Sequence, residues 1–317
     1  MDSQGNKTAA VLPDTNTIPC ETWDLNEDPV RLPSLPPLPT LTNGDEDEKP
    51  TQLVQIAGLD GHLIGLTNKG HVLKFDGLDS AETSSEGRWE YLPAFSEAAK
   101  VQEEYAEIGL DAPLTMKVTH ITANFGHFIA YSTGSSSVVL IGKTNTSADS
   151  QPKIIPELQN KSIISVVLGD YHSVALTANG KVFTWGAYSS GALGLGDPHS
   201  LAPGSPGAFA TEAQRLLALD RGRGTPPAVE VPTEVRFDHG RKTRKDRFCF
   251  SVAAAGWHTG ALVIDLEPDS EDAVEAIELE PEHRPLPRGR FQQRPIGHGP
   301  ITLPGFRVGF PGRPQTE

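Results

Sequence analysis

Four histidines recur in similar surroundings, and histidine binds metals and transfers protons near neutral pH. Each follows an aliphatic stretch with a nearby glycine and precedes a small-plus-aliphatic run; they are His62, His127, His172 and His258. A zinc site or a catalytic centre needs several such groups to converge, with ligands at close spacing. These four follow one another at intervals of 65, 45 and 86 residues, and none has a ligand-spaced partner in the sequence. We therefore interpret them as structural histidines that hydrogen-bond neighbouring backbone, not as metal ligands.

Other sequence features associated with catalysis are incomplete. The stretch Gly191-Ala-Leu-Gly-Leu-Gly196 is superficially similar to a phosphate-binding loop, yet it lacks the following Lys-Ser/Thr and helix. No Gly-x-Ser-x-Gly elbow occurs. The two cysteines, Cys20 and Cys249, are too few and too far apart for a disulfide framework or a four-ligand zinc site. We expect no enzyme and no cofactor.

The net charge indicates which classes of molecule the chain can bind. The chain has 317 residues with 27 Lys and Arg against 41 Asp and Glu, a formal net charge of −14. An acidic protein is poorly suited to neutralise nucleic-acid phosphates. The first ten residues are polar, and no apolar run approaches the ~20 residues that cross a bilayer. We expect a soluble cytoplasmic protein that binds proteins and neither nucleic acid nor membrane; the basic cluster Arg241–Arg247 raises the nucleus as an alternative location.

The elements that must position the histidines form a repeat. Each copy is predicted as a strand, a glycine-rich bend, a second strand, a tight turn and a third strand. Asn68-Lys-Gly and Asn179-Gly between apolar alternations favour tight hairpin turns. Repeats of about 50 residues built from antiparallel strands are typical of β-propeller blades. The longest gap predicts an insertion at 187–247, with a short helix around Thr211–Leu219.

The third copy carries a family resemblance. The strings His172-Ser-Val-Ala-Leu-Thr, Asn179-Gly-Lys-Val-Phe-Thr-Trp-Gly186 and Gly191–Asp197 resemble the regulator-of-chromosome-condensation repeat. Besides the four histidines, the signature positions that this resemblance marks as structural are Gly169, Trp185, Gly186, Gly194, Gly196, Gly256 and Trp257. We interpret both tryptophans as core residues; the alternative is that they are binding hot spots.

This resemblance implies an all-β fold of about four blades at residues 51–266. The family's propeller resembles seven blades of ~50 residues, so we expect a partial, open propeller. Its two outer sheet faces would be exposed, and we expect the chain to aggregate, to self-associate through these open ends as a dimer, or to require a missing N-terminal half.

A narrower resemblance concerns function. The strings Gln55–Phe75, Trp185–Gly196 and Ala255–Val263 resemble the C-terminal half of fungal SCF-associated F-box proteins. That resemblance implies the substrate-recognition part of an SCF-type E3 ubiquitin ligase, with a protein substrate and cullin-ligase subunits as partners. Such proteins place an F-box upstream, and nothing in residues 1–50 resembles one. The alternatives are a guanine-nucleotide exchange factor for a small GTPase, as in the family's founding member, and a truncated fragment without function.

The flanks and the insertion differ in composition from the repeats. Residues 1–50 are predicted as a disordered, proline- and acid-rich segment, and residues 267–317 as an acidic linker and an Arg/Gly/Pro-rich tail. Arg31–Pro39 favours polyproline geometry. An SH3-type ligand is one interpretation, but Ser34 stands where that motif needs proline, so we favour a solvated linker. In the insertion, the candidate partner-binding residues are Tyr188, Arg241, Lys242, Arg244 and Lys245.

Overall fold

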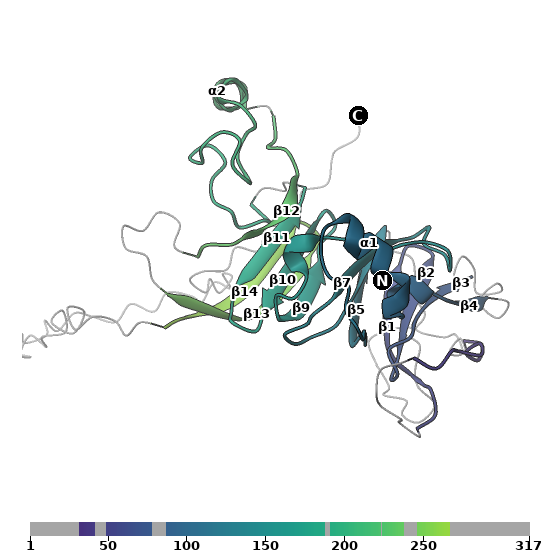
Figure 1. Ribbon diagram of the computed structural model, residues 1–317. Coiled ribbons are helices and arrows are strands. Elements are labelled where there is room, and N and C mark those ends of the chain that lie inside the picture. Colours follow the sequence, from purple (N-terminus) through teal and green to yellow (C-terminus); the bar gives the residue numbers. More distant parts are fainter. Residues whose placement is uncertain are drawn as a thin grey trace, which may run out of the picture. The chain divides into compact units, whose positions relative to one another are not determined.

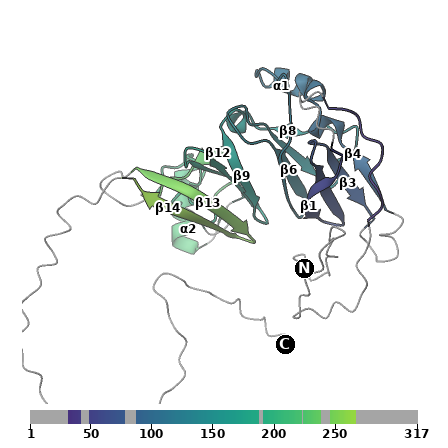
Figure 2. The same ribbon diagram turned by 90° about the horizontal axis from the view of Figure 1, so that it is seen from below.

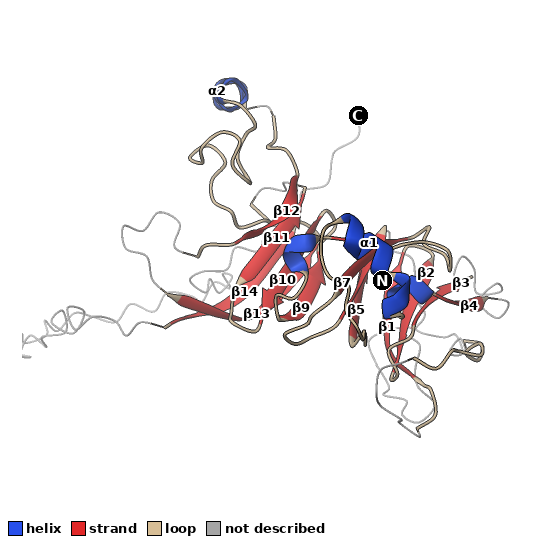
Figure 3. Cartoon of the chain, viewed as in Figure 1, coloured by secondary structure: helices blue, strands red, loops and turns tan. Residues whose placement is uncertain are grey.

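The chain is described by a computed structural model in which residues 32–41, 49–77, 87–187, 191–222, 224–237 and 246–266 are placed. The chain divides into two compact units, 1–268 and 269–317, and all of these residues lie in the first. Strands predominate among them, as Figure 3 shows, and every strand pairing is antiparallel. The predicted all-β class is confirmed.

Three sheets have four strands each, in chain order or its reverse (Figure 1). The first contains β1 (Leu53–Leu59), β2 (His62–Thr67), β3 (Val72–Asp76) and β4 (Arg88–Tyr91). The second contains β5 (His120–Asn124), β6 (His127–Tyr131), β7 (Val139–Lys143) and β8 (Lys153–Ile154). The third contains β9 (Ile163–Leu168), β10 (His172–Thr177), β11 (Val182–Gly186) and β12 (Val229–Glu234).

A two-stranded sheet follows, made of β13 (Arg247–Ala255) and β14 (His258–Asp265), which are the green arrows in Figure 2. The first strands of successive sheets are in contact: β1 with β5, β5 with β9, and β9 with β13. Four meandering sheets joined in this way form a partial β-propeller whose sheets do not close into a ring.

Tight turns join the second and third strands of the first and third sheets, as predicted. Gly70 and Gly180 have φ angles of +95° and +77°, which only glycine adopts without strain. A Cβ at Gly180 would lie 2.5 Å from the ring of Phe248, so this turn also needs glycine to let β13 approach. The glycine of the Asn179-Gly180 pair is therefore needed both for the tight turn and for the contact between the third sheet and β13.

The helices are short and lie in the connections between strands. Two 3-10 helices (Pro93–Phe95 and Ala98–Lys100) and α1 (Gln102–Glu107) link the first sheet to the second. A third 3-10 helix, Pro156–Leu158, precedes β9. The predicted helix in the insertion is confirmed as α2 (Glu212–Arg221): Thr211 Oγ1 accepts a hydrogen bond from the Gln214 N–H at its start, and Gly222 ends it with φ +59°.

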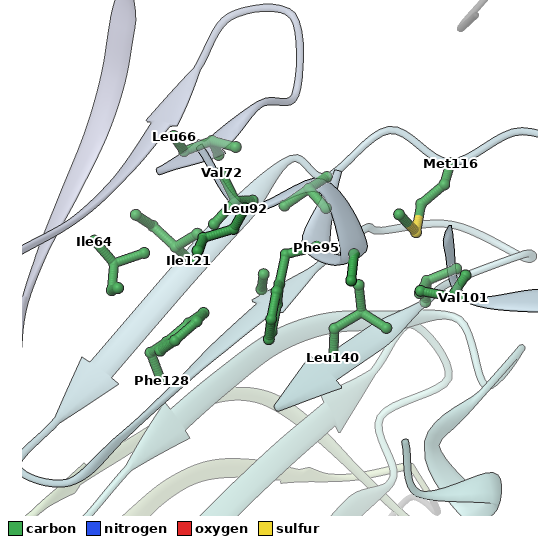
Figure 4. Close-up of a cluster of buried hydrophobic side chains, with 14 of the residues drawn as sticks. Ile64, Leu66, Val72, Leu92, Phe95, Val101, Met116, Ile121, Phe128 and Leu140 are labelled. Carbon is green, nitrogen blue, oxygen red and sulfur yellow. The ribbon is translucent and has the colours of Figure 1, made fainter. Parts of the chain in front are cut away.

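Apolar side chains fill the spaces between consecutive sheets. The first and second sheets enclose the largest cluster, in which Phe95 from the connection packs beside Phe128 of β6, with ring centroids 5.0 Å apart (Figure 4). A second cluster joins the second and third sheets, and it includes Trp185. A third joins β10 and β11 to β13. Because the third sheet is covered on both faces, β10 is buried along its whole length.

The insertion is shorter than the predicted 187–247. Val229–Glu234 pairs with β11 as the fourth strand of the third sheet, so the fold itself uses this part of the insertion. This strand was not predicted because it contains a proline, Pro232. The proline is tolerated since β12 is the edge strand of its sheet.

Only one of the two outer faces has the predicted exposure. On the last sheet, Phe250, Leu262 and Ile264 are at least half exposed. On the first sheet, Leu32, Leu35 and Leu38 pack against the apolar outer face. For residues 32–41 the solvated-linker interpretation is therefore wrong, because their leucines find an apolar surface within the same chain. Residues 1–31, 42–48 and 267–317, where we predicted disorder and a tail, lie outside the described residues.

Candidate protein-binding surface

The four repeat histidines occupy one structural position. His62, His127, His172 and His258 are the first residues of β2, β6, β10 and β14, that is, of the second strand in each sheet. The alignment made from sequence therefore corresponds to equivalent places in the fold. Because each histidine belongs to a different sheet, the four do not gather at one centre. In the described part of the chain, no group of three or more His, Cys, Asp or Glu side chains could hold a metal ion.

The contacts of these histidines connect strands. His172 is 1% exposed, and its Nε2 shares a hydrogen bond of 2.7 Å with Oγ1 of Thr259 in the next sheet. Burial lowers the pKa of His172 and of His127, which favours their neutral forms. His62 Nδ1 lies 2.8 Å from Oδ1 of Asp76, at the end of β3 in its own sheet. These environments agree with structural roles.

The bends that precede the histidines are linked from sheet to sheet. The Asp60 N–H donates to the Phe125 carbonyl at 3.0 Å, and the Asp170 N–H donates to the Gly256 carbonyl at 2.8 Å. Asn124 Nδ2 donates to Asp170 Oδ1 at 3.4 Å, which joins the second bend to the third. The four bends therefore form a continuous row, which we call the bend row. Sequence reasoning missed these links, because they depend on which bends become neighbours.

Two signature glycines are required by close backbone approach. A Cβ at Gly169 would lie 2.2 Å from the His172 ring and 2.8 Å from the Gly256 carbonyl. Gly186 has φ +117°, and a Cβ there would lie 2.5 Å from the Tyr171 carbonyl. Gly194, Gly196 and Gly256 also have positive φ. Gly169 and Gly186 thus allow the backbone to pack closely around His172.

An aromatic pair is exposed on the bend row. The side chains of Tyr171 and Trp257 are 58% and 56% exposed, and their ring centroids are 6.1 Å apart. Trp185 is buried, as predicted. The prediction of a core role for Trp257 is wrong, because Trp257 lies at the bend between β13 and β14, where the described residues leave its ring uncovered. Tyr171 was missed as a site residue; its only signal is its place immediately before His172.

The predicted partner-binding loop cannot be located on this surface. Tyr188, Arg241, Lys242, Arg244 and Lys245 all lie outside the described residues. The described part of the insertion instead exposes several leucines on α2. Its exposed leucines, between 48% and 56% accessible, are Leu216, Leu217 and Leu219.

A cavity of about 320 Å³ lies between the second and third sheets. Its lining is mostly aliphatic and aromatic, with Ile129, Ile141 and Trp185 among the lining side chains. The polar groups around it are those of His127, Ser173 and two lysines.

Comparison with known families agrees with this geometry. Residues 163–191 match the regulator of chromosome condensation (RCC1) repeat. This RCC1 repeat runs from β9 through β11, so it contains Gly169, His172 and Trp185, three of the positions singled out from sequence. The predicted repeat type is confirmed for the third sheet.

Two curated fungal proteins resemble a larger part of the chain. SCF-associated factor 1 of Saccharomyces cerevisiae is 31% identical over 158 residues, which is 49% of this chain and 22% of that protein. F-box protein pof9 of Schizosaccharomyces pombe is 28% identical over 165 residues, 51% of this chain and 30% of that protein. The chain therefore spans less than a third of either relative.

Among solved structures, yeast RCC1 (Prp20) bound to Kap60 is similar, with a TM-score of 0.39 and 18% identity over 72% of this chain and 43% of that one.

No helix in the described residues is long and apolar enough to span a membrane.

Proposed function

We propose that this chain is a non-catalytic protein-binding repeat module that serves as the substrate-recognition part of an SCF-type E3 ubiquitin ligase. The observation that carries the proposal is the exposed pair Tyr171 and Trp257 on the bend row of a fold whose relatives include an SCF-associated factor and an F-box protein. The similarity supports the ligase context. The exposed aromatic pair supports the binding role.

The bend row has the properties of a protein contact. Tyrosine and tryptophan dominate the energetics of protein interfaces, because their large rings bury much apolar area with little loss of side-chain freedom. Both rings here are more than half exposed, whereas Trp185 at the end of the adjacent strand is buried. The backbone links around Asp170 and Gly256 hold the two bends, so the pair is already positioned before a partner arrives.

The leucines of α2 are a second contact area of the same module. Leu216, Leu217 and Leu219 are exposed on one short helix. An exposed apolar patch on a surface insertion is where a repeat protein presents recognition residues. We expect the substrate to contact the bend row and α2, and the ligase subunits to be reached through other parts of the assembly.

The test is affinity capture from fungal cells in which the proteasome is inhibited, followed by quantitative mass spectrometry. The tagged full chain should recover cullin-ligase subunits together with a ubiquitin-modified protein. The double variant Tyr171→Ser/Trp257→Ser should lose that protein at least tenfold while it keeps the ligase subunits. The matched control is Leu114→Ser, because Leu114 is 98% exposed and lies outside the bend row.

Three outcomes contradict the proposal. Recovery of a small GTPase whose nucleotide exchange the chain accelerates would favour the exchange-factor alternative. Recovery of chaperones alone would favour a fragment without function. Equal recovery of the ubiquitin-modified protein by the double variant would show that recognition does not use the bend row.

A further inference from the structure

Residues 32–41 lie on the first sheet with a periodicity of three. Leu32, Leu35, Leu38 and Leu41 are all half-buried, whereas Ser34, Pro37 and Thr40 are exposed. A polyproline helix has three residues per turn, so residues three apart share one face. The four leucines therefore form a single apolar stripe, and the exposed residues form a second stripe that faces solvent.

The leucine stripe packs on the outer face of the first sheet through Leu32, Leu35 and Leu38. That face consists of Leu63 of β2, Leu73 and Phe75 of β3, and Trp89 of β4, all at most 5% exposed. The alternate residues of the same strands, such as Ile64 and Val72, point the other way and pack against the second sheet. The first sheet is thus covered on one side by a sheet and on the other by an extended segment.

Two side chains of the sheet also bind the backbone of the segment. Trp89 Nε1 donates to the Pro33 carbonyl at 3.2 Å, and His71 Nε2 donates to the Pro39 carbonyl at 2.8 Å. A polyproline helix has no internal hydrogen bonds, so its carbonyls are available to such donors. The rings of Phe75 and Trp89 lie 5.2 Å apart beneath the segment. An aromatic surface with a tryptophan N–H donor is the chemistry by which proline-rich peptides are recognised.

We propose that the outer face of the first sheet is a binding site for extended proline-rich segments with a leucine at every third residue, and that residues 32–41 occupy it in cis. A tethered segment faces the site at an effective concentration of the order of millimolar, so it excludes free peptides of similar affinity. A partner segment of this chemistry binds when the cis segment is displaced. This inference does not depend on the ligase role.

The experiment displaces the cis segment in the full chain and supplies it in trans. Leu35→Asp places a charge in the middle of the leucine stripe, against the apolar outer face of the first sheet. The probe is a fluorescently labelled synthetic peptide of residues 31–41, and its binding is followed by anisotropy. We expect the peptide to bind Leu35→Asp at least tenfold more tightly than the unmodified chain, and a peptide carrying the same Leu35→Asp change to bind neither.

Two controls keep the result interpretable. Leu114→Asp introduces the same charge at a fully exposed leucine and should leave peptide binding at the level of the unmodified chain. If Leu35→Asp proves unfolded by circular dichroism, Leu38→Ser provides a milder displacement and should show the same gain in binding.

Either of two outcomes would overturn the proposal. One is that the unmodified chain and the folded displaced variant bind the peptide equally well, or that neither binds it. The other is concentration-dependent dimerisation of the displaced variant that blocks the peptide, which would identify a second copy of the chain as the occupant of this face.

Discussion

Replacing His172 with alanine distinguishes a structural histidine from a chemical one. The imidazole is 1% exposed, and its Nε2 shares a hydrogen bond with Thr259 in the next sheet. Loss of that bond costs about 1 kcal/mol. Removal of a buried ring of this size adds roughly 1–3 kcal/mol of lost burial and cavity. We expect His172→Ala to lower the free energy of unfolding by about 2–4 kcal/mol.

The pH dependence gives a second readout for the same residue. Burial lowers the pKa of His172, and its Nδ1 has no hydrogen-bond partner among the described residues. When the pH falls below about 6.5, the unfolded chain binds a proton there while the folded chain does not, so stability decreases. The slope from one such group is at most about 1.4 kcal/mol per pH unit. His172→Ala should therefore flatten the loss of stability between pH 7 and pH 5.

Urea denaturation at a series of pH values measures both effects. His258→Ala is the matched control, because His258 holds the same position in the last sheet but is exposed; it should change stability by less than about 0.5 kcal/mol. Thr259→Val and the double variant His172→Ala/Thr259→Val complete a double-mutant cycle. The coupling free energy between the two residues should be about 0.5–1.5 kcal/mol. An unchanged pH slope in His172→Ala, or zero coupling with Thr259, would refute the structural interpretation.

Two further pairs of substitutions test the packing around the sheets. Gln159 is buried and bonds the backbone of two residues and the Tyr105 hydroxyl, so Gln159→Leu should destabilise the chain by about 3–5 kcal/mol in chemical denaturation. Tyr105→Phe should cost only about 1 kcal/mol, because Gln159 keeps its backbone partners, and equal effects would contradict this assignment. Gly186→Ala combines a positive φ with a clash against the Tyr171 carbonyl and should lower stability by roughly 2–5 kcal/mol. Gly191→Ala has a positive φ but open space around it, so thermal melting should show a loss of only about 1–2 kcal/mol; a similar loss for both glycines would refute the steric argument.

The repeat could be predicted from sequence because its signals are local. Asn-Gly turns and a glycine beside a histidine need particular backbone angles, and these angles fix where a strand must end. The fourth strand of each four-stranded sheet was missed, since it follows connections of different length and β8 has only two residues. Which residues form such a strand depends on the unpaired edge of the third strand that lies beside them. No local sequence pattern records that neighbour.

The candidate site was harder to predict than the fold. Trp185 and Trp257 look alike in sequence, yet one is buried and the other exposed, because exposure depends on which sheet lies beside each ring. The leucines of residues 32–41 posed the same difficulty: spacing by three is equally compatible with a free polyproline helix and with a docked one. In both cases the deciding factor is a neighbour distant in sequence.

The succession of sheets along the chain has a consequence for how the molecule opens. In the described residues, the principal contacts between sheets join consecutive sheets. The free energy of unfolding is therefore close to a sum of contributions from the individual sheets and from the interfaces between neighbouring sheets. The two-stranded sheet has one such neighbour and opens at the lowest free energy, whereas the second and third sheets are each held from both sides. Amide exchange should therefore be graded along the chain and not uniform. A partner that packs on β14 would slow exchange in β9 to β11 as well, because it converts a terminal sheet into an internal one.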